Sequence, residues 1–314
     1  MKRIGLIGCG AVANYGHLPA IKAVGDLQLH AILDPDAGNL ARTQEKYGVP
    51  HAFTDAASFF ASGIEAVTIT SPAPCHRQNV LDAVAAGLPI LCEKPLAMDA
   101  AEASVMIAAA AQAGVALHTA FCYRYSASAL QIKELVASKA IGEIRSLRLI
   151  YNWNCHGKYT TDAQGQRVIQ ERRAGRMREG GPMVDCGTHQ IDLATFWLDS
   201  PVVSYSGHGA WVDEYEAPDH IWLHMAHANG AHTMVEISYS YYYNTAHRRH
   251  EFVYELIGTE GVIRYDREGQ SLTLDTAAGR QDLPFHHEKD FTRLYVEWAA
   301  SLHGRPAPLL TSAA

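Results

Sequence analysis

Several features that mark particular classes of protein are missing from this sequence of 314 residues. No apolar run approaches the roughly 20 residues that a membrane-spanning helix needs. Lysine and arginine form no basic block, and a formal net charge of −7 argues against an electrostatic surface for nucleic acids or membranes. The amino-terminal stretch MKRIGLIGCG is too short and too glycine-rich for a signal peptide. We therefore expect a cytoplasmic protein with no nucleic-acid or membrane partner.

Motifs for metal and redox chemistry are also lacking. The six cysteines are scattered, and no pair has Cys-x-x-Cys spacing, so we expect reduced and mostly buried thiols. Among the 17 histidines, HIWLHMAH (residues 220–227) puts His220 and His224 on one face of a predicted strand and His227 on the other. Neither this group nor the HRRH and HH pairs completes a zinc ligand set. We predict no metal site.

What is present is an ordinary globular composition, with 48% hydrophobic and 19% charged residues, and enough length for two domains. Near the start, an apolar strand over residues 3–7 leads directly into GCGAVA (residues 8–13). A helical pattern over residues 17–24 and a second apolar run follow, and the second run ends at Asp34. This order is typical of a dinucleotide-binding turn rather than of an isolated glycine motif.

Each residue of this turn has a physical task. Gly8 allows the tight turn, Gly10 lets the backbone approach a pyrophosphate, and small Ala13 permits close packing of helix on strand. The predicted cofactor contacts in the turn are Gly8, Gly10, Ala11, Val12 and Ala13. Asp34 can accept hydrogen bonds from the ribose hydroxyls, and Pro35 offers no positive charge for a ribose phosphate. We therefore predict NAD in preference to NADP.

Strands and helices continue to alternate as far as Phe121. The expected elements are a strand at 65–70, a helix at 79–86, a strand at 89–93, a helix at 100–113 and a strand at 115–121. Such alternation indicates a doubly wound, mostly parallel sheet, which binds ligands beyond the carboxyl ends of its strands. TSPAPCH (residues 70–76) and CEKP (residues 92–95) should lie there. Taken alone, Lys94-Pro95 fits a crevice lysine and a solvated strand end equally well, and the X-Pro bond could be cis.

Four motifs in order, GCGAVA, SPAPCH, CEKPLA and GGPMVDCGTHQIDL, resemble the glucose–fructose oxidoreductase, inositol dehydrogenase and MocA (Gfo/Idh/MocA) family. The likeness runs from Ile4 to about Leu198. It implies an α/β Rossmann domain with a doubly wound parallel sheet, over residues 1–121. It also implies an α+β domain with a large, mostly antiparallel sheet for substrate binding and oligomerisation, over residues 122–314. Most members are NAD(P)-dependent oxidoreductases of sugars, cyclitols and related polyols.

The resemblance also assigns roles. The family's catalytic lysine, aspartate and histidine fall on Lys94, Asp185 and His189. The cofactor-side matches are Glu93, Ser71, Pro72 and His76. Here Ala73 stands where the family usually has asparagine, which puts in doubt a side-chain contact from that position. Many members also continue into a further terminal helix beyond the point where LLTSAA ends.

The second half of the chain predicts an antiparallel sheet, because short strands follow one another without helices. A helix at 126–138 comes before these strands, and a helix at 290–302 follows them. The polar stretch 155–178 is expected to be a loop over a binding crevice. Candidate substrate contacts, which are equally well interpreted as surface or core side chains, are Tyr123, Arg124, Trp153, Asn154 and His156. YSYYYN (residues 239–244) indicates a sheet face or a subunit contact, and we expect a homo-oligomer, a dimer or tetramer, through this sheet.

The stretch EGGPMVDCGTHQIDLATFW (residues 179–197) is the other half of the expected site. Pro182 suits the first turn of a helix, on which Asp185 and His189 would share one face, one turn apart. Such a pair could chelate a metal, transfer a proton or simply begin a helix. With a dinucleotide turn and a candidate crevice lysine upstream, proton transfer is the best interpretation.

The predicted reaction is the oxidation of a secondary alcohol on a sugar or cyclitol, with hydride transfer to NAD. His189 would be the general base, Lys94 would stabilise the developing alkoxide, and Asp185 would orient the substrate hydroxyl and the imidazole. Two alternatives remain open from the sequence. One is cleavage of a glycoside through transient oxidation, and the other is a non-catalytic regulator that binds sugar or NAD.

Overall fold

The computed structural model describes residues 1–153, 158–241, 245–247 and 249–311. The chain divides into two compact units, Met1–Tyr125 with Asp290–Ala314, and Ser126–Lys289. This division differs from a boundary after residue 121, because helix α9 (Phe291–Leu302) belongs to the first unit and packs against α1 (Leu18–Ala23). Both helices bury apolar side chains, so α9 covers a face of α1 that would otherwise meet water.

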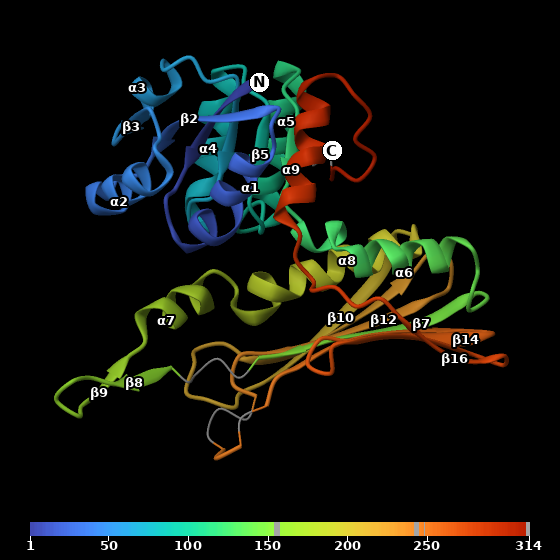
Figure 1. Cartoon of the computed structure of the whole chain (residues 1–314). Helices are drawn as coiled ribbons and strands as arrows, with labels where there is room; N and C mark the ends of the chain where they lie inside the picture. Colours follow the sequence, from blue (N-terminus) through green and yellow to red (C-terminus); the bar gives the residue numbers. More distant parts are fainter. Residues whose placement is uncertain (154–157, 242–244, 248, 312–314) are drawn as a thin grey trace. The chain divides into compact units, whose positions relative to one another are not determined.

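The first unit is built on a six-stranded parallel sheet with the order β3-β2-β1-β4-β5-β6. Its strands are β1 (Lys2–Ile7), β2 (Leu27–Leu33), β3 (His51–Phe53), β4 (Ala66–Ile69), β5 (Ile90–Cys92) and β6 (Leu117–Thr119). Its other helices are α2 (Ala37–Tyr47), α3 (Ala56–Phe60), α4 (Ala73–Ala85) and α5 (Ala100–Ala113), seen around the sheet in Figure 1. β4 and β5 are buried along their whole length, as strands covered on both faces are. The predicted doubly wound parallel sheet is confirmed.

The strand order reverses between β1 and β4, because the chain first adds β2 and β3 on one side and then β4, β5 and β6 on the other. Open parallel sheets bind ligands beyond the carboxyl ends of their strands at such a reversal. The glycine turn follows β1, the Ser71 loop follows β4 and the Lys94 turn follows β5, so all three leave the same edge of this sheet.

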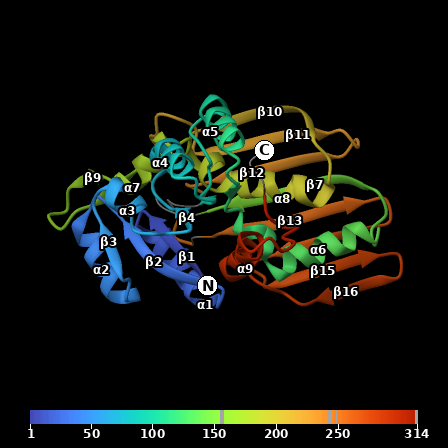
Figure 2. The ribbon, with the colours of Figure 1, turned by 90° about the horizontal axis from the view of Figure 1, so that it is seen from above.

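The second unit contains an eight-stranded sheet with the order β10-β11-β12-β7-β13-β14-β15-β16 (Figure 2). Its strands are β7 (Ile144–Asn152), β10 (Val202–Ala210), β11 (His220–His227), β12 (His232–Ser238), β13 (Glu251–Gly258), β14 (Gly261–Asp266), β15 (Ser271–Thr276) and β16 (Gly279–Leu283). Only the β12–β7 pair is parallel among the pairs in this described sheet, so the predicted large and mostly antiparallel sheet is confirmed. β16 was not predicted.

Helices α6 (Ala127–Ala137) and α8 (Thr188–Leu198) lie together on one face of this sheet (Figure 1). α8 contacts β7 and β12, and the Trp197 indole N–H donates to the Ala129 carbonyl of α6 at 2.9 Å. Trp197 is almost completely buried, so it anchors α8 through both its ring and its N–H group. This anchoring fixes the helix that carries His189.

The stretch predicted as a loop over 155–178 is structured where the structure describes it, so that prediction is wrong. It forms a hairpin of β8 (Tyr159–Thr161) and β9 (Arg167–Ile169), followed by helix α7 (Glu171–Arg178). The Asp162 carboxylate accepts hydrogen bonds from the Gln164 and Gln166 N–H groups, which closes the hairpin turn. Met177 packs α7 onto Tyr215 and Tyr239. Local turn chemistry and a distant apolar cluster together order a segment whose composition is polar.

Within the described part of the chain, no helix combines the length and apolar character required to cross a membrane.

Candidate active site

The turn after β1 is shaped by contact with the loop after β4. Gly8 has a φ of +93°, and a Cβ built on it would lie 2.6 Å from the Ser71 backbone nitrogen. The Thr70 hydroxyl donates to the Gly8 carbonyl at 2.6 Å. Both the backbone angle and the close approach require glycine here, as the sequence predicted.

Gly10 has the opposite surroundings. A Cβ built on Gly10 would meet no atom within 4 Å, so the backbone faces open space where a side chain could stand. Helical structure begins at the next residue, which leaves backbone N–H groups unpaired at its amino end. Open space in front of unpaired N–H groups at a helix start fits a pyrophosphate.

Asp34 is fixed within the same unit. It is 8% exposed, its Oδ2 accepts the Cys9 N–H at 2.7 Å and its Oδ1 accepts the Asp36 N–H at 2.8 Å. A carboxylate oxygen can accept more than one hydrogen bond, so both oxygens can also accept from ribose hydroxyls. The nearby Cys9 thiol stays neutral, because burial and, to a smaller extent, the Asp34 charge raise its pKa to about 12. This chemistry fits NAD and opposes a ribose phosphate.

His76 links two of the loops at this edge of the sheet. It is 1% exposed, with Nδ1 2.8 Å from the Pro95 carbonyl oxygen and Nε2 2.8 Å from the Ser71 carbonyl oxygen. The Ser71 hydroxyl in turn accepts a hydrogen bond from Asn79 Nδ2 at 2.8 Å. Asn79 lies in α4, which Ser71 and Pro72 precede. In the described structure, both His76 ring nitrogens lie against backbone carbonyl oxygens, which accept from whichever nitrogen carries a proton. A cofactor contact by His76 stays a prediction.

The Lys94–Pro95 peptide bond is cis, one of the geometries that the sequence allowed. The preceding residue, Glu93, is 6% exposed. Its Oε2 accepts the Lys94 N–H at 3.1 Å, and its Oε1 lies 2.8 Å from His17 Nε2. Burial alone would raise the pKa of Glu93, but the His17 hydrogen bond and the positive charges of His17, Lys94 and His76 lower it below its usual value. Glu93 is therefore a carboxylate.

Asp185 and His189 lie in the second unit, at the junction of two kinds of helix. Asp185 is in η3 (Met183–Gly187), a wide π-helical turn, and His189 is in the first turn of α8. The predicted helix with Pro182 in its first turn is present, since residues 181–198 are helical without a break. Its π turn changes the angle between Asp185 and His189 from that of a regular α-helix. The backbone reaches this turn through Gly180 and Gly181, which have φ values of +108° and +68°. His189 is 5% exposed.

The Asp185 carboxylate is held by two side chains of its own unit. Its Oδ2 accepts the Tyr239 hydroxyl at 2.6 Å, and its Oδ1 lies 4.0 Å from Arg176 Nη1. Burial, followed by the Asp185 charge, raises the pKa of Tyr239 well above its ordinary value, so the phenol remains a donor. Burial opposes the charge of Arg176, but Asp185 and Glu179 outweigh that effect and raise its pKa. Asp185 is thus oriented as an acceptor.

Arg173 packs against the ring of Tyr239. Its guanidinium carbon lies 4.2 Å from the Tyr239 ring centroid and 5.4 Å from that of Trp153, and the residue is 3% exposed. Cation–π contacts of this kind fix a ring in place. Trp153, a predicted substrate contact, also stacks on Tyr151, with centroids 6.0 Å apart.

The other predicted substrate contacts have different surroundings. Tyr123 is 2% exposed and Arg124 is half-buried, and both lie in η2 (Cys122–Tyr125) of the first unit. Asn154 and His156 lie outside the described residues. A substrate role for these side chains stays a prediction.

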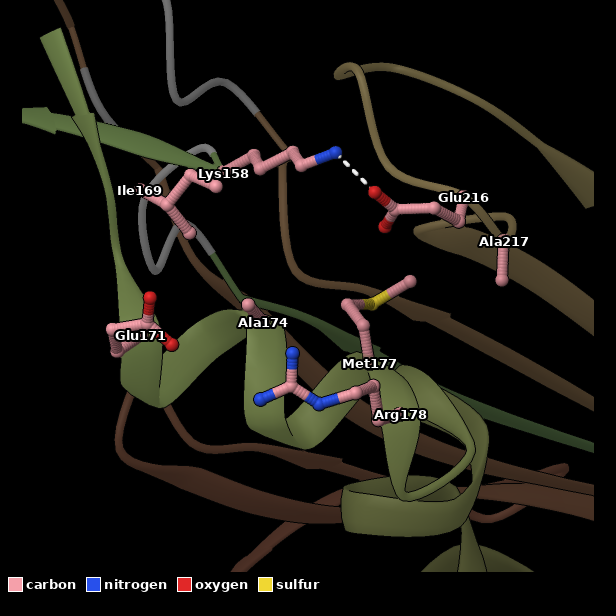
Figure 3. A pocket seen from close by; sticks show the side chains of 8 residues that line it. All are labelled: Lys158, Ile169, Glu171, Ala174, Met177, Arg178, Glu216 and Ala217. Atoms are coloured by element: carbon pink, nitrogen blue, oxygen red, sulfur yellow. Dashed lines mark hydrogen bonds and ion pairs between the residues drawn. The ribbon is translucent and has the colours of Figure 1, made fainter.

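A cavity of about 380 Å³ lies beside α7 in the second unit (Figure 3). Its lining residues are Lys158, Ile169, Glu171, Ala174, Met177, Arg178, Glu216 and Ala217. Lys158 forms an ion pair with Glu216 across it, and Met177 also belongs to the apolar cluster with Tyr239. The cavity therefore adjoins the side chains that hold Asp185.

The histidines noted in the sequence have local partners. His220 Nε2 lies 3.1 Å from Glu236 Oε1, His224 Nδ1 lies 3.3 Å from His232 Nε2, and His227 contacts Thr233. In the residues with described positions, no group of three or more His, Cys, Asp or Glu side chains is arranged to hold a metal ion.

Sequence analysis missed four residues that bear on this site, Tyr239, Arg176, His17 and Tyr295. Tyr239 begins the YSYYYN run that was interpreted as a sheet face or subunit contact, and Arg176 belongs to the stretch predicted as a loop. In the first unit, the signal available from the sequence was a histidine, His17, at the start of an apolar helical pattern. The structure shows that this histidine is buried.

Comparison with known proteins finds matches in both units. The model of an oxidoreductase family with an NAD-binding Rossmann fold matches residues 2–121, and the model of the GFO/IDH/MocA C-terminal domain matches residues 129–264. A D-glucoside 3-dehydrogenase of Escherichia coli is 30% identical over 202 residues, 64% of this chain and 55% of that protein. A myo-inositol 2-dehydrogenase of Thermotoga maritima is 32% identical over 214 residues, 68% of this chain and 60% of that protein. The chain thus spans less than two thirds of either relative.

Among solved structures, an oxidoreductase from Agrobacterium radiobacter in complex with NAD+, L-tartaric acid and magnesium has the same fold, with a TM-score of 0.81 and 24% identity. The match covers 99% of this chain and 91% of that chain. With the two family models covering both units in order, this chain belongs to the Gfo/Idh/MocA family of oxidoreductases, whose amino-terminal domain is an NAD-binding Rossmann fold.

Proposed function

We propose that this protein is an NAD-dependent dehydrogenase that oxidises a secondary alcohol of a sugar, cyclitol or related polyol. The observation that carries the proposal is Lys94, which follows β5 at the sheet edge where the glycine turn and Asp34 fit NAD. A cation at that edge can stabilise an alkoxide as it forms. The named relatives are dehydrogenases of a glucoside and of an inositol, which supports the substrate class.

The second unit supplies the groups for proton transfer. We propose that His189 accepts the hydroxyl proton, because an imidazole titrates near neutral pH in its unperturbed state. Asp185, held by Tyr239 and Arg176, accepts a hydrogen bond from the substrate and so orients the reacting carbon. When bound, NAD supplies the oxidised nicotinamide that takes up the hydride.

Absorbance of reduced cofactor at about 340 nm, measured across a panel of sugars and cyclitols with NAD and NADP, tests the proposal. We expect NADH formation with at least one polyol, and a loss of about 100-fold or more in kcat in Lys94→Ala and His189→Ala. The matched control is Lys22→Ala, on α1, whose amine contacts the Tyr47 carbonyl. Undiminished turnover in both site variants would falsify the assignment.

We also propose a homo-oligomer formed through the sheet of the second unit, in the cytoplasm. In support, Val203 and Tyr205 on β10 are 63% and 79% exposed, which is unusual for large hydrophobic residues on an edge strand. Light scattering that reports a single chain would contradict the oligomer.

In support of a reducing compartment, the five cysteines with described positions are free thiols. Cell fractionation tests the location.

A further inference from the structure

A chain of buried polar side chains runs from helix α9 to the Lys94 turn, entirely within the first unit. The Tyr295 hydroxyl oxygen lies 2.8 Å from His17 Nδ1, and His17 Nε2 lies 2.8 Å from Glu93 Oε1. Glu93 then accepts the Lys94 N–H through its other oxygen, at 3.1 Å. His17 and Tyr295 are completely buried. A residue near the carboxyl terminus is thereby connected to the candidate catalytic lysine.

Burying these polar side chains costs free energy of folding, so their presence in the core calls for a reason. A carboxylate and an imidazole in a protein core lose hydration, and apolar residues of similar size often replace such pairs with no loss of stability. The surrounding core supplies apolar neighbours, since Cys92 precedes Glu93 and Ile69 accepts the Glu93 N–H at 2.9 Å, and both are fully buried. Stability alone therefore gives little reason for a buried Glu93–His17–Tyr295 chain.

Hydrogen-bond chemistry keeps Glu93 an acceptor. As a carboxylate it can only accept, so His17 Nε2 must carry the proton between them. Nδ1 then either accepts the Tyr295 O–H or, when it is also protonated, donates to the Tyr295 oxygen. The Tyr295 hydroxyl also lies 3.0 Å from Thr68 Oγ1, so it has a partner in both arrangements. Glu93 therefore holds the Lys94 N–H whichever form His17 takes.

Aromatic packing fixes the position of the imidazole. The Phe291 ring lies 4.9 Å from the His17 ring and the Tyr295 ring lies 5.7 Å from it, and both rings come from α9. A Cβ added to Gly16 would lie 2.7 Å from the Phe291 ring, so glycine is needed for α9 to approach this closely. The helix thus encloses His17 on two sides.

The Lys94 turn is held from a second direction as well. His76 Nδ1 lies 2.8 Å from the Pro95 carbonyl oxygen, one residue beyond Lys94. The backbone on either side of the Lys94 side chain is therefore fixed by two separate buried histidines, His17 through Glu93 and His76 directly. Such double support suits a side chain whose position must be accurate.

We propose that Tyr295 and His17 are positioning residues for Lys94: through Glu93 they fix the Lys94 backbone and so set the direction of the lysine side chain. This inference rests on the proposed function, because it requires Lys94 to stabilise the alkoxide. It assigns a role in the reaction to α9, which begins some 200 residues after Lys94 in the sequence.

The first test is Tyr295→Phe, which keeps the ring against His17 and removes the hydroxyl. We expect kcat to fall about tenfold, since small misplacements of a catalytic group have effects of this size or larger. KM for NAD should change by less than about twofold, because the turn after β1 and Asp34 are untouched. The matched control is Tyr254→Phe, a buried tyrosine of the second unit whose hydroxyl has no hydrogen-bond partner among the described residues. It should keep the wild-type kcat.

A pair of variants at His17 separates positioning from mere stability. Glutamine can place an amide N–H near the Nε2 position and donate to Glu93, whereas leucine cannot. We expect His17→Gln to keep kcat within about threefold of wild type and His17→Leu to lose about tenfold or more. Rates are expressed per NADH-binding site from a fluorescence titration, so that unfolded protein does not count. A purely structural role would lower the number of sites and leave kcat per site unchanged, which would overturn the proposal.

Hydrogen exchange gives a readout that needs no turnover. The peptide spanning residues 90–98 should exchange faster in Tyr295→Phe and His17→Leu than in wild type or Tyr254→Phe, because the Lys94 N–H loses its fixed acceptor. Wild-type exchange together with wild-type kcat in both variants would refute the positioning role. If Lys94→Ala is as active as wild type, the proposed function fails. If Lys94→Ala is inactive while Tyr295→Phe and His17→Leu match wild type, only the positioning role fails.

Discussion

At the scale of single residues, Asp34 shows how one carboxylate can serve both the fold and the cofactor. It accepts two backbone N–H groups within its own unit, from Cys9 and Asp36, and has lone pairs left for ribose hydroxyls. Its negative charge lies where NADP would bring a phosphate. Preference for NAD therefore depends on this side chain.

Removing that carboxylate should change cofactor selection. In Asp34→Ala we expect KM for NAD to rise about tenfold and the ratio of kcat/KM for NAD to that for NADP to fall by at least as much. The control is Asp36→Ala, since Asp36 caps α2 by accepting from Gly38 and Asn39. It should lower stability slightly and leave the cofactor ratio unchanged. Equal ratios in wild type and Asp34→Ala would show that selection lies elsewhere.

Tyr239 fixes Asp185 through a hydrogen bond of 2.6 Å from its hydroxyl. In Tyr239→Phe the carboxylate loses a charge-assisted hydrogen bond, which is worth about 1.5–3 kcal/mol, so kcat/KM should fall about 10- to 100-fold. Steady-state kinetics on the best substrate measures the change. Tyr265→Phe is a fair comparison, because that buried hydroxyl donates to the His286 carbonyl at 3.2 Å and touches neither Asp185 nor His189. A loss of similar size in both variants would contradict a specific role for Tyr239.

Glu93 should also make stability depend on pH. Burial opposes its charge, but His17, Lys94 and His76 lower its pKa below the reference value of 4.5. A carboxyl group with a lowered folded-state pKa stabilises the fold fully above its unfolded value and progressively less as pH falls through the folded value. This contribution is therefore present at pH 7 and declines below about pH 4.5.

Chemical unfolding of Glu93→Gln at several pH values measures this contribution. At pH 7 the variant should be less stable than wild type by about 2 kcal/mol, the range for a hydrogen bond to a charged group, and the gap should narrow below about pH 4.5. Glu260→Gln, at an exposed position, should follow the wild-type curve at every pH. A gap that stays constant down to pH 3 would be incompatible with an ionised Glu93.

At the scale of elements, hydrophobic patterning predicted most strands of both sheets, but not β3 in the first or β16 in the second. The expected strand ending at Asp34 and the helix over 100–113 agree with β2 and α5. α4 begins at Ala73, six residues earlier than expected, because proline is tolerated in a first helical turn and PAPC resembled a loop. α7 could not be predicted from its own composition, since Met177 orders it by packing on tyrosines outside it.

The start of α9 links stability to the reaction. The Asp290 carboxylate accepts the Arg293 N–H at 2.8 Å, as the Asp99 carboxylate accepts the Glu102 N–H at 2.8 Å on α5. Asp290→Ala and Asp99→Ala should each lower the free energy of unfolding by about 1 kcal/mol, measured by urea titration. Only Asp290→Ala should also lower kcat, because fraying of this end loosens Phe291 and Tyr295 around His17. A fall in kcat in both variants would indicate a general effect of stability.

At the scale of the whole molecule, contacts between residues that are far apart in the sequence could not be predicted. Lys94, Asp185 and His189 came from a family resemblance between ordered motifs. The residues that fix their positions were not predicted, because contacting residues lie far apart in the sequence. Tyr239 is 54 positions from Asp185, and Tyr295 is 278 positions from His17. Local periodicity shows that a helix has a buried face but not which unit covers it. For the same reason α9 was expected in the second domain.

The division of the chain into two units leads to a final prediction. The Asp290 N–H donates to the Cys122 carbonyl at 3.3 Å, so a short glycine-serine linker can join Tyr125 to Asp290. We expect this fusion of residues 1–125 and 290–314 to melt cooperatively and to bind NADH. Residues 1–125 alone should do neither well, because Leu18 and Ile21 lose the cover of α9 and His17 loses Tyr295.

Calorimetry and NADH fluorescence compare the two chains directly. The loss of α9 removes completely buried Leu294, Tyr295 and Trp298 from the first unit, far more apolar contact than the few kcal/mol by which a domain is stable. A chain of residues 1–125 with the melting temperature and NADH affinity of the fusion would show that α9 is dispensable to the first unit. That result would also remove the basis for connecting Tyr295 to Lys94, since the helix would then contribute nothing that the Rossmann sheet needs.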